Sequence, residues 1–124
     1  VGSEMCIRDS PRIHTYTEHI QDFEDTAALC HLMDFVISVD TSVAHLSAAM
    51  GKTTWTLIPF APDWRWMLHR EDTPWYDSMR LCRQEKAGDW QPLLKKLATD
   101  MLAIQPALRR AKSENQGNNL AIPV

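Results

Sequence analysis

A strand, a helix and a second strand follow one another without a gap between residues 35 and 58, and this order limits the possible folds. Residues 35–39 read FVISV, a continuous apolar and β-branched run that is typical of a strand covered on both faces in a parallel sheet. Residues 41–50 are rich in alanine, and Gly51 stands where a helix C′ residue is expected. The second strand, TTWTLI at residues 53–58, ends at Pro59. This βαβ crossover predicts an α/β fold with a parallel sheet.

Further elements are predicted on both sides of this unit. Residues 13–17 (IHTYT) favour a short strand, and Asp22 is placed to cap the helix that follows it. After a loop, residues 79–82 predict a last short strand. A helix is then expected from residue 90 to about 104, with Asp89 as its N-cap.

The two ends of the chain differ from its middle. The first ten residues, VGSEMCIRDS, resemble an adapter-derived scar of metagenomic assemblies, so we expect them, Cys6 included, to be non-native and the protein to extend further upstream. With 124 residues the chain allows one domain, which we assign to residues 11–104. Residues 105–124 are polar and lack an apolar period, which predicts a disordered tail.

Charge and cysteine content exclude several classes of function. Thirteen Lys and Arg against sixteen Asp and Glu give a net charge of −3, which argues against nucleic acid and anionic membrane surfaces as partners. No apolar run approaches the ~20 residues that cross a bilayer. The three cysteines contain no CxxC pair, and His14, His19 and His31 form no recognisable ligand set, so neither a disulfide framework nor a metal site is expected. We expect a cytoplasmic protein.

The residues after the strand at 35–39 are the candidates for ligand binding. In open parallel sheets ligands bind at the carboxyl ends of the strands, where Asp40, Thr41 and Ser42 begin the next helix. The first helix amides and the two hydroxyls suit a phosphate, and His45 lies one turn further along to reach the same anion. The Asp40 carboxylate would repel a phosphate, so it caps amides or accepts a bond from a sugar hydroxyl. The alternative is an ordinary helix cap with a satisfied core histidine.

A longer pattern around these residues resembles a known enzyme family. The segment DTSVAHLSAAMGKTTWTLIPFAPDWRW is similar to the C-terminal half of glycosyltransferase family 9, the heptosyltransferase-like enzymes with the GT-B fold, whose motif reads D-[TS]-x-x-x-H-L-x-x-A-x-G. PDWRW at residues 62–66 and PWYDSMRLCRQ at 74–84 resemble a variant often found behind tetratricopeptide repeats. The resemblance covers most of residues 12–102. The family often has Gly at the third motif position, where this chain has Ser42.

The resemblance implies a partial, doubly wound, Rossmann-like sheet that binds a nucleotide-sugar donor. Thr41, Ser42 and His45 would hold the donor diphosphate, and His45 would stabilise it as it leaves during inverting transfer to a hydroxyl. No metal and no further cofactor would be required. The general base would lie in an N-terminal domain missing from this chain, which alone would be inactive. The acceptor would be a glycan, lipopolysaccharide core or protein.

The resemblance also predicts the position of each strand. In the strand order 3-2-1-4-5-6, residues 13–17 form strand three and residues 35–39 strand four. Strands one and two would lie upstream, so the strand at 35–39 should have an unpaired side.

Aromatic residues in the loop leave two interpretations open. Trp64, Arg65 and Trp66 either line the cleft, with a tryptophan stacking on a base or sugar and Arg65 facing phosphate, or pack the loop against the sheet. Trp75 and Tyr76 are expected to anchor the loop. Ser42 with His45 lacks a GxSxG elbow, so hydrolysis is not expected. The second functional interpretation is a non-catalytic α/β scaffold or protein-interaction module beside tetratricopeptide repeats.

Overall fold

The chain folds into a three-stranded parallel sheet with helices on both faces. The computed structural model describes residues 14–118, so the predicted scar at residues 1–10 lies outside the described part. The elements are η1 (Thr17–His19), α2 (Phe23–Leu32), β1 (Val36–Val39), α3 (Ser42–Ala49), β2 (Thr54–Ile58), η2 (Trp64–Trp66), β3 (Met79–Arg83) and α4 (Gln91–Asn118). The predicted strand, helix and strand over residues 35–58 and the strand at 79–82 are confirmed.

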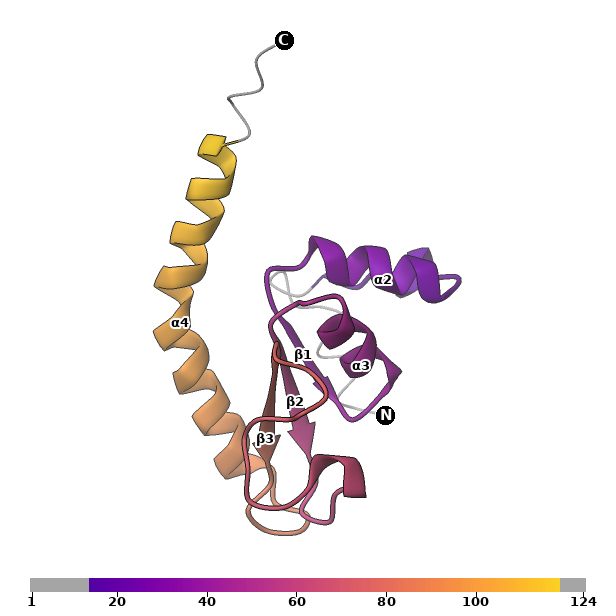
Figure 1. Cartoon of the computed structure of the whole chain (residues 1–124), viewed down its shortest axis with the longest axis vertical. Coiled ribbons are helices and arrows are strands. Elements are labelled where there is room, and N and C mark those ends of the chain that lie inside the picture. Colours follow the sequence, from indigo (N-terminus) through magenta and orange to yellow (C-terminus); the bar gives the residue numbers. More distant parts are fainter. Residues whose placement is uncertain (1–13, 119–124) are drawn as a thin grey trace.

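The sheet has the order β1-β2-β3, and both neighbouring pairs are parallel. Ile37 lies opposite Trp55, and Trp55 lies opposite Arg80, so these three side chains share one face. Figure 1 shows α3 on one side of the sheet and α4 on the other. The predicted α/β class is therefore confirmed, and the arrangement is compatible with part of a Rossmann-like sheet.

Two apolar clusters hold the helices on the sheet, and β2 takes part in both. On the α3 face the buried residues are Ala44, Ala48, Ile58, Trp66, Met79 and Leu81. On the α4 face they are Trp55, Cys82, Leu93 and Leu97. A hydrogen bond of 2.7 Å between the Ser47 and Thr54 hydroxyls satisfies two polar groups between α3 and β2. The central strand is thus the best buried strand in the molecule.

The prediction that residues 35–39 are covered on both faces is wrong. Ile37 and Val39 are 37% and 51% exposed, while four of the five residues of β2 are buried. The α4 cluster covers Trp55 and Cys82, and it does not extend over Ile37 and Val39 on the same face. The apolar run therefore predicted a strand correctly, but it did not predict which faces of the strand are buried.

The predicted strand at residues 13–17 is absent from the described residues 14–17. A short 3₁₀ turn forms instead, in which the Tyr16 carbonyl accepts a hydrogen bond of 2.9 Å from the His19 amide. Residues 14–19 are all exposed. β-Branched composition favours a strand only where a neighbouring strand supplies hydrogen bonds, and in the described part of the chain this segment pairs with none.

The predicted helix ends are confirmed at α2 and α3. The Asp22 carboxylate accepts a hydrogen bond of 2.9 Å from the Asp25 amide, as an N-cap does. Gly51 follows α3 with a φ of 76°, a left-handed conformation that favours glycine. The Asp89 carboxylate accepts a hydrogen bond of 3.2 Å from the amide of Gln91, which is the first residue of α4. Asp89 therefore lies one position earlier than the N-cap, the position that we predicted for it.

The predicted end of the last helix at about residue 104 is wrong, because α4 continues to Asn118. The disorder expected from residue 105 is therefore not seen up to residue 118. This segment is polar, but alanine, leucine, lysine, arginine and glutamate are all strong helix formers. The Lys112 ammonium lies 3.2 Å from the Asp34 carboxylate and ties the distal half to the loop before β1. Among the described helices, none is long and apolar enough to cross a membrane.

The outer edge of β1 is predicted to exchange its amide hydrogens rapidly. The Val36 amide donates to the Thr53 carbonyl at 3.0 Å, so the alternate amides of Ile37 and Val39 point to the side where no described strand lies. In hydrogen-exchange mass spectrometry or NMR, we expect these two amides to exchange at least about ten-fold faster than that of Thr56 in β2. Equal protection would show that another strand covers this edge.

Candidate functional site

The candidate site lies where β1 and β2 end. Asp40 follows β1, Thr41 caps α3, and η2 comes after β2 at the same edge of the sheet (Figure 1). Parallel strands place their carboxyl ends together, so the crossover itself brings these segments to one edge. The predicted location of the site at this edge is a consequence of the fold.

Asp40 holds the loop after β2 against the start of α3. Its Oδ2 accepts a hydrogen bond of 2.8 Å from the indole Nε1 of Trp66. Its Oδ1 lies 3.7 Å from Nε2 of His45. The first predicted role of Asp40, capping helix amides, is not seen, because Thr41 is the N-cap of α3 and the Asp40 carboxylate accepts from the Trp66 indole instead. The second predicted role, a bond from a sugar hydroxyl, stays a prediction.

His45 is fixed by aromatic neighbours but keeps one ring nitrogen available. Nδ1 lies 3.2 Å from the Tyr76 hydroxyl, and the imidazole stacks on the Trp66 indole with ring centroids 5.2 Å apart. The distance of 3.7 Å from Nε2 to Asp40 is too long for a hydrogen bond. Within the described residues Nε2 therefore has no hydrogen-bond partner, and the side chain is 32% exposed. In the tautomer that carries its proton on Nε2, His45 can donate a hydrogen bond to a ligand in the site.

Thr41 and Ser42 lie at the start of α3, as predicted. The Thr41 carbonyl accepts from the amides of Ala44 and His45. The Thr41 hydroxyl is 3.1 Å from the Ser38 hydroxyl and 3.4 Å from the Val39 carbonyl. This hydroxyl already has partners within the chain, whereas Ser42 is exposed at the first helical position.

An open cavity of about 490 Å³ lies beside His45. It is lined by His45, Trp64, Arg65, Trp75 and Tyr76. The structure thus brings two of the predicted site residues, His45 and Arg65, to one cavity. Asp40 contributes through its contact with His45, while Thr41 and Ser42 are not among the lining residues.

The two tryptophans of η2 have opposite roles. Trp66 is 1% exposed and belongs to the apolar core, so the packing interpretation is correct for this residue. Trp64 is 75% exposed and lines the cavity. Trp75 anchors the loop as expected, because its Nε1 donates to the Arg65 carbonyl at 3.0 Å. The sequence reasoning missed the contact of Tyr76 with His45, since a separation of 31 residues gives no local signal.

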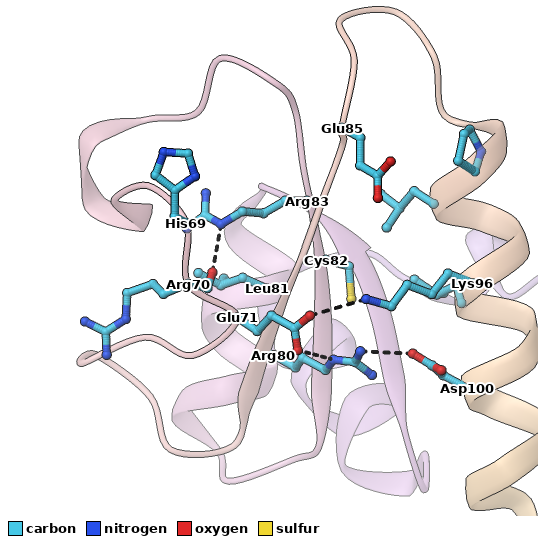
Figure 2. A pocket seen from close by; sticks show the side chains of 13 residues that line it. His69, Arg70, Glu71, Arg80, Leu81, Cys82, Arg83, Glu85, Lys96 and Asp100 are labelled. Atoms are coloured by element: carbon cyan, nitrogen blue, oxygen red, sulfur yellow. Dashed lines mark hydrogen bonds and ion pairs between the residues drawn. The ribbon is translucent and has the colours of Figure 1, made fainter.

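A second cavity, of about 260 Å³, lies between β3, α4 and the preceding loop (Figure 2). Arg80 pairs with Asp100 at 2.9 Å and with Glu71 at 3.7 Å, and Glu71 also pairs with Lys96 at 3.3 Å. The Arg80 guanidinium also lies 4.7 Å from the centre of the Trp55 ring. These charges neutralise one another, so we assign the network to packing of α4. Within residues 14–118 no cluster of His, Cys, Asp and Glu side chains is arranged to hold a metal ion.

Cys82 lies in this second cavity and is predicted to be unreactive. Burial raises the pKa of its thiol, so less thiolate forms at a given pH. In iodoacetamide labelling at pH 8, followed by peptide mass spectrometry, we expect Cys82 to react at least about ten-fold more slowly in the folded chain than in urea. Equal rates in both conditions would contradict this assignment.

Replacing Trp66 tests the link between Asp40 and the loop. Trp66→Phe removes the indole donor and part of the buried volume, so we expect the free energy of unfolding to fall by about 1–3 kcal/mol in urea titrations. The matched control is Trp64→Phe, two residues away on an exposed side chain, for which a change within about 0.5 kcal/mol is expected. Similar losses for both variants would show that the buried Trp66 indole, with its bond to Asp40, stabilises the fold no more than an exposed indole does.

Comparisons with known proteins show a partial similarity to a longer bacterial protein. The chain is 36% identical over 78 residues to Protein FlbA of Caulobacter vibrioides, covering 63% of this chain. It spans only 13% of the length of that relative. No family model matches the chain, and no solved structure matches it.

Proposed function

We propose that this chain binds the diphosphate of a nucleotide-sugar donor, as the C-terminal half of a GT-B glycosyltransferase similar to family 9. The main support is the placement of His45, whose Nε2 makes no hydrogen bond within the described residues and whose ring borders an open cavity shared with Arg65. The Asp40 carboxylate lies 3.7 Å from this nitrogen. A diphosphate needs cationic and hydrogen-bonding groups that converge from different segments, and α3 and the loop after β2 supply one each.

The same arrangement suits the departure of a nucleoside diphosphate. Negative charge grows on the leaving oxygen as the bond to the anomeric carbon breaks. A donor on His45, the guanidinium of Arg65 and the N-terminal end of α3 can stabilise this charge because their positions are already set. In this proposal the acceptor hydroxyl attacks the opposite face, which inverts the anomeric carbon. The general base belongs to another part of a longer protein.

The remaining parts of the proposal concern partners and location. In this proposal the acceptor is a glycan, a lipopolysaccharide core or a protein side chain. The described domain acts together with an N-terminal domain of the same protein, and the reaction takes place in the cytoplasm. The sequence resemblance to family 9 supports this part of the proposal.

A non-catalytic interaction module is the second candidate, and one observation favours it. Trp64, Leu68 and Phe60 are 75%, 65% and 56% exposed on the loop after β2. Exposed apolar side chains gathered on one loop are typical of a protein-binding surface. This candidate predicts no response to nucleotides.

A thermal-shift titration distinguishes the two candidates. The full-length protein is titrated with UDP, ADP and GDP, and a ligand at 100 times its Kd should stabilise the fold by ~2.7 kcal/mol. We expect one nucleotide to raise the Tm and His45→Ala to abolish most of the rise. His31→Ala, which removes an exposed histidine from α2, is the control and should leave the rise unchanged. The absence of any rise would favour the interaction module.

A further inference from the structure

Two exposed tryptophans border the cavity beside His45. Trp64 is 75% exposed and Trp75 is 54% exposed, and both line the same cavity of about 490 Å³. Large aromatic side chains lose much of their hydration when a ligand covers them, so such a pair is a strong binding surface. The diphosphate-binding role proposed above uses His45 and Arg65 and assigns no ligand to the exposed surfaces of these two indoles.

The chain fixes the backbone turn that carries Trp64 and the indole of Trp75 before any ligand binds. The Asp63 carboxylate accepts from the Arg65 amide at 3.1 Å, which fixes the 3₁₀ turn that presents Trp64. Trp66 anchors the other end of this turn in the core. The indole of Trp75 is fixed by its hydrogen bond to the Arg65 carbonyl. Because these positions are preorganised, binding costs little conformational entropy.

We propose that Trp64 and Trp75 bind a pyranose ring next to the diphosphate. The face of an indole is electronegative and attracts the polarised C–H groups on the apolar face of a sugar ring. The hydroxyl groups at the edge of the same ring need polar partners. Tyr76, Arg65 and His45, which line the cavity, supply these partners. The inference rests on the proposed function, because the sugar is placed beside the groups assigned to the diphosphate.

One further contact supports a sugar on this surface. The Arg65 guanidinium lies over one face of the Trp64 ring, 5.7 Å from its centre, so in this proposal the sugar stacks on the other face of this exposed indole. A ligand with an anionic diphosphate and a neutral ring joined to it can therefore contact Arg65 and Trp64 together. The pyranose comes either from the donor or from the acceptor, and both have the same ring chemistry.

Binding measurements on the full-length protein test the inference. Isothermal titration calorimetry is performed with UDP, ADP and GDP, with UDP-glucose, ADP-glucose and GDP-mannose, and with methyl α-glucopyranoside. We expect Trp64→Ala to weaken the matching nucleotide hexose about ten-fold while changing the nucleoside diphosphate less than about two-fold. Trp75→Ala should also weaken the nucleotide hexose about ten-fold and affect the nucleoside diphosphate less, although it removes the hydrogen bond to the Arg65 carbonyl. Trp64→Phe should retain most of the affinity. Phe60→Ala removes another exposed aromatic ring of the same loop, outside this cavity, and should change neither ligand.

The outcomes separate the inference from the proposed function. If the tryptophan variants lose affinity for methyl α-glucopyranoside but not for the nucleotide hexoses, the pyranose site is also supported, and its sugar belongs to the acceptor. Equal losses for the nucleoside diphosphate and its hexose conjugate would overturn the inference, because the indoles would then stack on the base. Unchanged affinities in both tryptophan variants would also overturn it, while a loss of nucleotide binding in His45→Ala would still support the proposed function. If methyl α-glucopyranoside binds through the tryptophans and no nucleotide binds, the proposed function fails and the pyranose site stands.

Discussion

The hydrogen bond from the Trp66 indole to the Asp40 carboxylate joins the end of β1 to the loop after β2. The indole that makes this bond is also buried against α3 and β3, and the imidazole of His45 stacks on it. One side chain therefore fixes the loop, the acidic residue and the histidine relative to the sheet. If the loop lay elsewhere, His45 would lose its stacking partner and the cavity would lose one side.

The arrangement assigns different tasks to side chains that look alike in the sequence. In the segment WRW, the first tryptophan is exposed, the second is buried, and the arginine between them remains half-exposed. A 3₁₀ turn has about three residues per turn, so residues two apart point in different directions. The buried Trp66 and the exposed Trp64 are consequently parts of one short segment. The burial of Trp66 therefore determines where Trp64 is presented.

The helices and strands could largely be predicted from the sequence, but which faces of the strands are buried could not. Local patterns depend only on residues that are close in the chain. Three of them were correct: the strand predicted from the apolar run at residues 35–39, the helix end at Gly51 and the N-cap at Asp22. The exposure of Ile37 and Val39 depends on where α4 crosses the sheet, which no local pattern encodes. The failure at residues 14–17 has the same cause, since a strand requires a partner.

The candidate site shows the same division. The strand order brought Asp40, Thr41, Ser42 and His45 to the predicted edge, because the crossover alone determines that edge. The partner of Asp40 and the contact between Tyr76 and His45 involve separations of 26 and 31 residues, and only the tertiary structure reveals them. The place of Arg65 after β2 was enough to predict that it lies at the site. The opposite orientations of Trp64 and Trp66 could not be predicted in this way.

Pro106 within α4 has a mechanical consequence. Proline lacks an amide hydrogen, so the carbonyl of Leu102, four residues earlier, loses its usual helical partner. Before this point α4 places Leu93 and Leu97 in the core, and after it Leu108 lines a cavity with Met33 and Phe35, and Lys112 pairs with Asp34. The turn at Pro106 lacks one helical hydrogen bond, so contacts with the residues before β1 support the helix where its own backbone is weakest.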